Sequence, residues 1–407
     1  MVGSPFDASH AGDYTDGAGS GDRLLTLRFL ALCTAALGYF MGIGSTLPVV
    51  PTFVEDDLGG GGVAVGLSMG AFGISAALLR PLIGPIGDRR GRRVLLVLGS
   101  AVVSASLLML IPATSVLMVV VARLVLGLGE AAFFIGVSSS VQDIAPPARR
   151  GEATSYFTVT LYGGMAVGPA IGERLMDAGS ADRAFLVAAV LALVPIALFR
   201  AAPGRPDEPP EARPMRWSLH SDALRPGLML SVGLLSYAGL LAFLALHATD
   251  MGIASSGTVF TVFGLVVVAA RIVGARIPDR LGALTTTRFS MGLIAVGMFV
   301  LGTWTSATGV YIGVVVTALG QCFLFPALFV LTVDRAPDDE RSHAIGSFSV
   351  SFDLAIGLGG LVVGAVVTAT DRPGGFVFCA AVAALALVLT GPLLGRIGQR
   401  GRSGIRG

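Results

Sequence analysis

Lysine is absent from this sequence of 407 residues, and charged residues of either sign are scarce. Charged side chains make up 13% of the chain, whereas soluble domains carry about 25%. The hydrophobic share is 54%, and the mean hydropathy is +0.80. This composition excludes a soluble globular enzyme and a disordered chain. The net charge of only +2, without a long basic patch, excludes a nucleic-acid-binding protein.

Cysteine is also rare, and its placement excludes two further kinds of site. Cys33, Cys322 and Cys379 each lie in an apolar run, with no Cys-x-x-Cys pair and no histidine close by. Neither a disulfide framework nor a zinc site follows from them, and no other metal site or cofactor is expected. The glycine-rich stretch 59–62 lacks the Lys-Ser/Thr that completes an ATP-binding P-loop, so ATP is not expected as an energy source.

What the chain does have is apolar runs. In a helix about 20 residues cross a hydrocarbon core of about 30 Å, and twelve runs reach that length or come close to it. They cover residues 26–50, 63–87, 94–112, 115–138, 152–176, 182–201, 224–249, 256–277, 287–305, 308–331, 344–368 and 374–396. The short alternating segments of a β-barrel are absent. The expected fold class is therefore an all-α polytopic membrane protein with twelve transmembrane helices, embedded in a lipid bilayer.

The arginines orient these runs. If the N-terminus is inside, 22 of the 28 arginines fall in segments on the cytoplasmic side. The remaining six are Arg174, Arg183 and Arg372 on the other side, and Arg80, Arg123 and Arg271 within the runs. Positive charge accumulates on the cytoplasmic side of membrane proteins. We therefore expect both termini in the cytoplasm and a location in the plasma membrane of a bacterium or archaeon.

The two halves of the chain repeat one another at a constant offset of 191 residues. Arg80 matches Arg271 at this offset, and further matches continue for nearly a hundred residues. The first runs match only at an offset of 198, which aligns Tyr39 with Tyr237. We predict two six-helix bundles, 26–201 and 224–397, joined by a cytoplasmic linker over 202–223, with a disordered tail over 1–25 and a cytoplasmic tail over 398–407. Parallel repeats of this kind are typical of transporters, with the substrate site between the halves.

One polar loop carries a specific motif. Between the second and third runs the sequence reads Gly84-Pro-Ile-Gly-Asp88-Arg89-Arg-Gly91-Arg92-Arg93, and a weaker copy, Asp279-Arg280-Leu-Gly282, lies between the eighth and ninth runs. The first copy resembles the cytoplasmic signature of the major facilitator superfamily, G-x-x-x-D-R-x-G-R-R, at every fixed position. Span number, repeat, linker and topology agree with that family over the whole chain. The resemblance implies alternating access without a cofactor, driven by a proton gradient.

The resemblance also implies roles for the loop. A carboxylate near a helix N-terminus is favoured by the unpaired amides and the helix dipole. In the family, the residue equivalent to Asp88 is thought to cap the eleventh helix, and the one equivalent to Arg92 to pair with an acid at the end of the fourth, here Asp143. These contacts would close the cytoplasmic side and break on switching. The alternative is that the arginine cluster only anchors the topology.

Three charged residues at membrane depth are candidates for proton coupling: Arg123, Glu130 and Asp353. Charges inside a membrane are costly and normally face a cavity or a partner. Arg123 and Glu130 lie seven residues apart on the fourth run, about 10 Å along a helix, so a direct ion pair between them is not expected. Their run is similar to the family pattern R-x-x-x-G-x-G-x-A. A static pair with a neighbouring helix is the alternative. Asp353 aligns with Tyr162, and it has two alternatives to proton coupling: it binds a cationic substrate, or its carboxyl bonds a serine or threonine on an adjacent helix.

The fifth run resembles the family's antiporter-type signature, which exporters carry. The matching positions are Gly164, Gly168, Pro169 and Gly172, but Glu173 replaces the final glycine. Glycines at four-residue spacing also serve plain helix packing, which is the alternative. Further cavity candidates, on the helices that line the family's cavity, are Tyr39, Tyr237, Gln321 and Phe325. His247 is expected to be exposed at the outer end of the seventh run, without a transport role.

The sequence as a whole predicts a secondary active transporter that exports a small organic molecule in exchange for protons, similar to the drug or metabolite:proton antiporters of the family. A monomer is expected. The nearest alternative is a proton-coupled uptake symporter for a sugar or other metabolite. A membrane receptor that transports nothing is a more distant one. An enzyme is not expected, because no paired acids with a nearby histidine occur at membrane depth.

Overall fold

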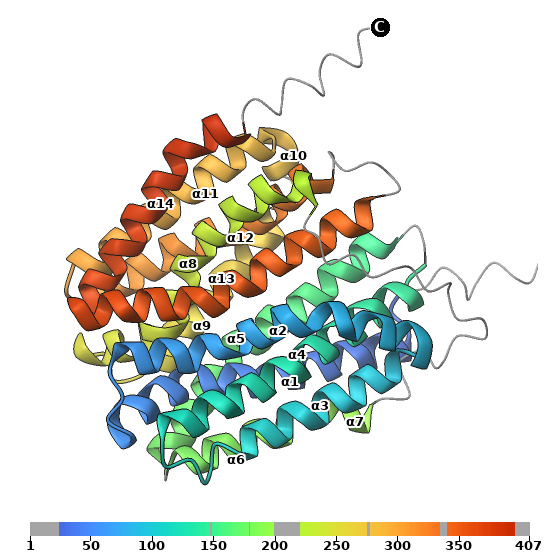
Figure 1. Cartoon of the computed structure of the whole chain (residues 1–407), viewed down its shortest axis with the longest axis horizontal. Coiled ribbons are helices and arrows are strands. Elements are labelled where there is room, and N and C mark those ends of the chain that lie inside the picture. Colours follow the sequence, from blue (N-terminus) through green and yellow to red (C-terminus); the bar gives the residue numbers. More distant parts are fainter. Residues whose placement is uncertain are drawn as a thin grey trace, which may run out of the picture.

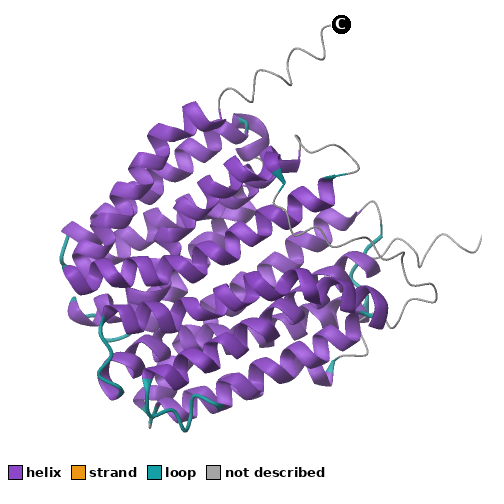
Figure 2. Ribbon diagram, viewed as in Figure 1, coloured by secondary structure: helices purple, strands orange, loops and turns teal. Residues whose placement is uncertain are grey.

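The computed structural model describes residues 24–146, 149–178, 180–198, 220–274, 277–333 and 340–394. All regular secondary structure in these residues is helical (Figures 1 and 2). The elements are α1 (Leu27–Thr52), the π-helix η1 (Phe53–Asp57), α2 (Gly62–Arg90), α3 (Arg92–Leu108), α4 (Val116–Ile144), α5 (Arg150–Asp177), α6 (Ala181–Ala192), α7 (Val194–Ala197), α8 (Ser221–Asp250), α9 (Ser256–Gly274), α10 (Ile277–Leu281), α11 (Ala283–Thr303), α12 (Ala307–Val333), α13 (Arg341–Ala369) and α14 (Arg372–Leu394).

The helices confirm the predicted apolar runs. Each run corresponds to one helix, except that the sixth is divided into α6 and α7 just before Pro195, which has no amide hydrogen to donate. Among the described residues, nine helices are long and apolar enough to cross a membrane. Three of the predicted spans are not among these nine. Helix α3 has 17 residues, α6 has 12, and α5 is rich in glycine and hydroxyl side chains. Most of the predicted linker and tails lies outside the described residues.

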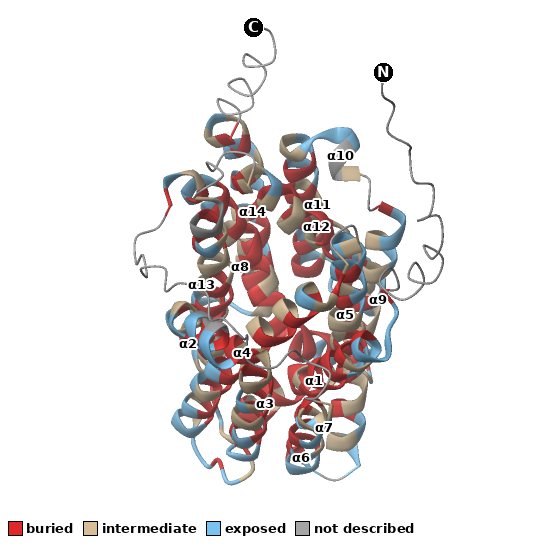
Figure 3. Ribbon diagram, turned by 90° about the vertical axis from the view of Figure 1, so that its right-hand side faces the viewer, coloured by how far each residue is buried: buried red, intermediate tan, exposed pale blue. Residues whose placement is uncertain are grey.

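The chain forms two layers of helices, one from each half. Helices α1–α7 make one layer and α8–α14 the other (Figure 1). The layers meet along two edges, where α2 packs beside α13 and α5 beside α9 (Figure 3). The repeat relates α2 to α9 and α13 to α5, so the two edges are equivalent. We call the end that holds Arg89–Arg93 the arginine-rich end, and the other, which holds Glu55 and Arg372, the opposite end.

Glycine allows α2 and α13 to approach closely over the part of their lengths nearest the opposite end. A Cβ atom on Gly66 would lie 2.0 Å from the carbonyl oxygen of Gly360, and one on Gly70 would lie 2.2 Å from that of Gly357. Small residues at four-residue spacing are the usual means by which membrane helices bring their backbones together. The layers are therefore packed together from the opposite end to about the middle of the helices.

Replacing Gly70 with alanine should destabilise this packing. The added methyl group has no room against Gly357, so α2 must move away from α13, and overpacking of this kind costs about 1–3 kcal/mol. We expect a lower melting temperature of the purified protein. Gly346→Ala is the matched control, because a Cβ atom there meets nothing within 4 Å. Equal melting temperatures for the two variants would show that this interface is not tightly packed.

The expectation that His247 is exposed is wrong. Its side chain is fully buried at the end of α8, where Nε2 lies 3.0 Å from the carbonyl oxygen of Leu301 and the ring packs edge-on against Phe376. Helices α11 and α14 cover this end of α8, which hydropathy along a single helix does not reveal. His247 therefore belongs to the core of the second half and does not face the cavity.

Candidate functional site

A cavity of about 660 Å³ lies between the two layers. At the arginine-rich end its wall includes Arg92 and Asp143, at the ends of α3 and α4, and from there it reaches the middle of the helices at Arg80 and Asp353. Small-molecule sites commonly have volumes of about 300–1,000 Å³. The walls are mainly apolar and aromatic, so the few charged groups at its inner end determine what chemistry the site offers.

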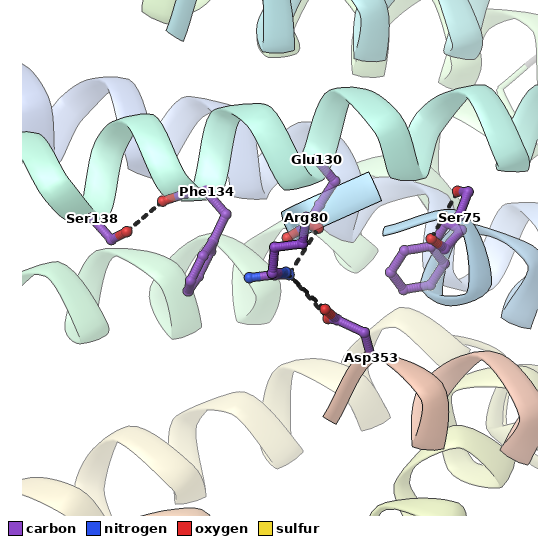
Figure 4. A network of polar contacts seen from close by, with 7 residues as sticks. Ser75, Arg80, Glu130, Phe134, Ser138 and Asp353 are labelled. Atoms are coloured by element: carbon purple, nitrogen blue, oxygen red, sulfur yellow. Dashed lines mark hydrogen bonds and ion pairs between the residues drawn. The ribbon is translucent and has the colours of Figure 1, made fainter. Parts of the chain in front are cut away.

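Arg80 is the centre of the first charged cluster, which we call the Arg80 cluster (Figure 4). Its Nε lies 2.7 Å from Oδ2 of Asp353, and its Nη2 lies 2.9 Å from Oδ1 of Asp353 and 3.4 Å from Oε2 of Glu130. The guanidinium also lies over the ring of Phe134, 5.2 Å from its centroid. All three charged side chains are largely shielded from solvent, with Asp353 only 6% exposed.

This cluster joins the two layers. Arg80 lies on α2 and Glu130 on α4, both in the first half, whereas Asp353 lies on α13 in the second. The contact between Arg80 and Asp353 is thus an ion pair across the interface, and it includes a charge-assisted hydrogen bond from Nη2 to Oδ1. A change in the charge of Asp353 therefore acts directly on the contact between the layers.

The structure brings together two of the three predicted coupling residues and places the third apart. Arg123 is buried on α4, where its Nε donates to the carbonyl oxygen of Ser68 at 3.1 Å and its guanidinium lies over Phe72. Asp353 makes the ion pair with Arg80 in place of the hydrogen bond to a serine or threonine that was one alternative. The sequence placed Arg80 only within a run, although a charge at membrane depth was itself a reason to include it in the site.

A second arginine faces the same cavity from the other layer. Nη2 of Arg271, on α9, donates to the hydroxyl of Tyr162 on α5 at 3.3 Å, and the guanidinium lies 4.9 Å from the centroid of the tyrosine ring. Gln321 on α12 also lines the cavity, and its Nε2 donates to the carbonyl oxygen of Gly233 at 3.0 Å. We call Arg271, Tyr162 and Gln321 the Arg271 cluster.

The aromatic candidates divide between cavity and core. Tyr237 and Phe325 line the cavity, as does Phe263, on which the ring of Tyr237 stacks at 5.8 Å. Tyr39 does not: it is fully buried in the first layer with its ring stacked on Phe133. The repeat aligns Tyr39 with Tyr237, but the two side chains pack against different neighbours, so alignment alone did not predict which one faces the cavity.

At the arginine-rich end, the loop motif lies at the mouth of the cavity. Nε of Arg92 is 3.4 Å from Oδ2 of Asp143, the pairing that the resemblance implies. Gly91 and Gly282 lie 191 residues apart, and each directly precedes a helix. Both have a positive φ, at 89° and 78°, and a backbone conformation of this kind favours glycine. Arg89 and Arg280 are exposed, and Arg93 is half-buried. The side chains of Asp88 and Asp279 and the surroundings of Gly84 lie outside the described part of the structure.

The glycines of the antiporter-type motif pack α5 against α1. A Cβ atom on Gly172 would lie 1.8 Å from the carbonyl oxygen of Ser45, one on Gly168 would lie 2.5 Å from that of Met41, and Gly164 is similarly close to Phe40. Pro169 is buried in the same helix. Both helices belong to the first layer, so the contacts of these glycines are those of helix packing.

Glu173, the residue that departs from that motif, connects the two layers at the opposite end. Its carboxylate accepts hydrogen bonds from the hydroxyls of Ser255 and Ser256, the latter at 2.9 Å, and from the backbone N–H of Gly257 at 3.0 Å. These groups form the N-terminus of α9, where unpaired amides and the helix dipole favour a negative charge. Glu173 of α5 thus caps a helix of the other half.

A second polar connection lies at the same end. Arg372, the first residue of α14, forms ion pairs with Asp250 at the end of α8 and with Glu55 of η1. Glu55 belongs to the first half and the other two residues to the second, so this pairing also crosses between the layers. With the glycine contacts and Glu173, it closes the opposite end.

Two overlapping parts of the chain, residues 32–307 and 227–402, match the family model described as Major Facilitator Superfamily. A Salmonella typhimurium protein described as an uncharacterized MFS-type transporter is 31% identical over 366 residues, covering 87% of this chain and 93% of the relative. A Burkholderia pseudomallei protein with the same description is 28% identical over 385 residues, covering 91% of this chain and 92% of the relative. Among solved structures, the nucleoside transporter NupG is similar in fold, with a TM-score of 0.73, 14% identity, and coverage of 91% of this chain and 99% of that one.

Proposed function

Because this chain belongs to the major facilitator superfamily of membrane transporters, we propose that it exports a small organic molecule through the central cavity in exchange for protons. The observation that carries the proposal is the Arg80 cluster, in which two carboxylates from different layers share one guanidinium. The cavity volume of about 660 Å³ suits a small organic molecule. Transport then requires that the cavity open in turn to either side of the membrane.

The distribution of arginine supports a cytoplasmic location for the arginine-rich end. With that orientation the cavity of the described conformation is open toward the cytoplasm and closed toward the outside. Switching to the other conformation requires that the contacts of Glu173 and Arg372 break and that the layers close at the arginine-rich end. The loop motif lies at the arginine-rich end, which is where the family has the contacts that close the cytoplasmic side.

Proton coupling follows from the charges of the Arg80 cluster. Arginine stays charged in proteins, so a proton taken up by the cluster binds a carboxylate. With both carboxylates ionised the cluster carries one excess negative charge, which favours uptake of a single proton. A proton on Asp353 removes the charge that holds α13 to Arg80 and so weakens the connection between the layers. Binding of a proton is thereby linked to the relative position of the layers.

Export rests on the resemblance of the α5 sequence to the antiporter-type signature and not on the contacts of its glycines, which are those of helix packing. The test is accumulation in vesicles that contain the purified protein, using a substrate identified by screening toxic compounds and metabolites against a deletion strain. Exchange for protons accumulates the substrate on the acidic side of an imposed pH gradient. Accumulation on the alkaline side would show uptake symport instead, and accumulation that ignores the gradient would refute proton coupling.

Replacing Glu130 with glutamine should reduce coupling without separating the layers. The variant loses one carboxylate of the Arg80 cluster but keeps the pair between Arg80 and Asp353. A hydrogen bond between charged groups contributes about 1.5–3 kcal/mol, so we expect pH-driven accumulation to fall at least about tenfold. Glu152→Gln is the control, because Glu152 is exposed and pairs with Arg149 on the surface. Full pH-driven transport in Glu130→Gln would show that Glu130 is structural.

A further inference from the structure

The two arginine clusters occupy equivalent positions in the repeat but differ in charge. Arg80 and Arg271 are 191 residues apart, and the same offset relates the partners of one to the partners of the other. Where Arg80 meets Asp353, Arg271 meets Tyr162, and the position equivalent to Glu130 is Gln321. Both carboxylates of the first cluster are thus replaced by neutral side chains in the second.

Arg271 consequently faces the cavity without a carboxylate partner in the described part of the chain. The groups that it contacts there are neutral: the hydroxyl of Tyr162 accepts one hydrogen bond, the tyrosine ring lies under the guanidinium, and the thiol of Cys322 lies beside it. Nε of Arg271 is inaccessible to solvent and has no hydrogen-bond partner among the described residues. Nε of Arg80 also lacks a hydrogen-bond partner by this criterion, but Arg80 has two carboxylates within ion-pair distance, whereas Arg271 has none in the described part of the chain.

An arginine at membrane depth normally has an anionic partner or lines a polar path, because burying its charge alone is costly. Nor does the other buried arginine of the cavity relieve the imbalance. Arg123 bonds to a backbone carbonyl and adds a further positive charge. Among the described residues, three arginines therefore surround the inner part of the cavity together with two carboxylates, and both carboxylates contact Arg80.

We propose that Arg271 binds the carboxylate of an organic anion, so that the substrate supplies in the second repeat the charge that acidic side chains supply in the first. This inference names the substrate class of the transport function proposed above and rests on it. The planar guanidinium matches the two oxygens of a carboxylate. Tyr162 is placed beside the same site, where its hydroxyl is able to donate to a bound carboxylate while its ring holds the arginine in position.

The rest of the cavity indicates the chemistry of the body of the anion, by which we mean the part other than its carboxylate. Four aromatic side chains of the second layer, Tyr237, Phe263, Phe325 and Phe352, form part of the wall of the same cavity. Such a wall binds an apolar or aromatic body through buried area and ring contacts. An aromatic or branched carboxylic acid fits this combination, whereas a cation with the same body would be repelled by Arg271.

The test compares three probes that share one body: 1-naphthoate, 1-naphthamide and 1-naphthylmethylamine. Binding is measured by calorimetry on the full-length protein in lipid nanodiscs, without a pH gradient. We expect 1-naphthoate to bind at least about tenfold more tightly than either neutral amide or cationic amine, and Arg271→Gln to remove this preference. Arg183→Gln is the matched control, because Arg183 is exposed and its Nη1 donates to the backbone carbonyl of Ala178 on the surface, away from the residues that line the cavity.

A second variant keeps the test valid if Arg271→Gln does not fold. Glutamate has nearly the same shape as glutamine, so Gln321→Glu gives the second repeat the acid that the first repeat has at Glu130. It should also remove the preference for the carboxylate, because the protein then supplies the negative charge itself. Equal affinity for the three probes in the parent, including no binding of any, would overturn the inference, as would retention of the preference in Arg271→Gln.

These outcomes are separable from a failure of the proposed function. Binding at equilibrium does not require proton coupling, so a preference for 1-naphthoate that depends on Arg271, in a protein whose transport ignores the pH gradient, would refute only the coupling. Proton-coupled transport of a neutral or cationic substrate, with equal binding of the three probes, would refute only the anion site.

Discussion

Replacing Asp353 with asparagine should abolish accumulation driven by a pH gradient while leaving exchange of labelled for unlabelled substrate at equilibrium. Asparagine neither takes up the transported proton nor pairs ionically with Arg80, so the link between proton binding and the position of the layers is lost. Breaking a buried ion pair typically costs about 3–5 kcal/mol, so we expect a loss of at least about 100-fold in pH-driven accumulation. Both quantities are measured in the same vesicles, which separates coupling from substrate movement.

The matched control is Asp182→Asn, the same substitution at an exposed acid of α6 outside the cavity. Asp353→Glu keeps the charge and should restore part of the pH-driven accumulation, which a purely steric role would not. If Asp353→Asn accumulated substrate against the gradient at the parent rate, Asp353 would be a structural partner of Arg80 only. A loss of pH-driven accumulation and exchange together would point to a damaged cavity, and the coupling role would have to be abandoned.

The second large effect is expected at Glu173, where replacement by alanine should shift the protein toward the conformation open at the opposite end. The variant loses three hydrogen bonds between the carboxylate and the N-terminus of α9. Hydrogen bonds to charged groups contribute about 1.5–3 kcal/mol each, and loss of even two of them changes the ratio of the two conformations by more than about 100-fold.

Labelling of a cavity cysteine measures this shift. Phe263→Cys is introduced into a protein in which Cys33, Cys322 and Cys379 are replaced by alanine, and a membrane-impermeant maleimide is applied from either side of oriented vesicles. The parent should react mainly from the side of the arginine-rich end, and Glu173→Ala from the opposite side. Glu152→Ala, on the same helix at the arginine-rich end, is the control. An unchanged labelling pattern in Glu173→Ala would mean that the cap does not hold this end closed.

The fold could be predicted from the sequence because its determinants are local. Span length and hydropathy placed all twelve helices, and the offset between Arg80 and Arg271 revealed the repeat. The sixth span was the exception in detail, since Pro195 divides it into α6 and α7. Family membership was equally accessible, because the loop motif over residues 84–93 is contiguous in the chain.

The site was only partly predictable because its contacts join distant segments. Glu130 and Asp353 stood out as acids at membrane depth, but their partner depends on how the two layers pack: Arg80 and Asp353 are 273 residues apart. Glu173 was noted merely as a departure from a glycine motif, and its function as a cap requires a helix terminus from the other half. Tyr39 and His247 were misplaced because a single helix does not reveal which of its faces its neighbours cover.

The difference between the two arginine clusters has an electrical consequence. When their carboxylates are ionised, the Arg80 cluster is net negative, while the Arg271 cluster is net positive. An internal field therefore runs across the cavity, transverse to the direction of transport. A guest molecule with a dipole moment is turned by this field as well as bound, and protonation of the Arg80 cluster cancels the negative pole. Under the proposed proton exchange, the torque on the guest thus changes when the Arg80 cluster takes up its proton, before any helix has moved.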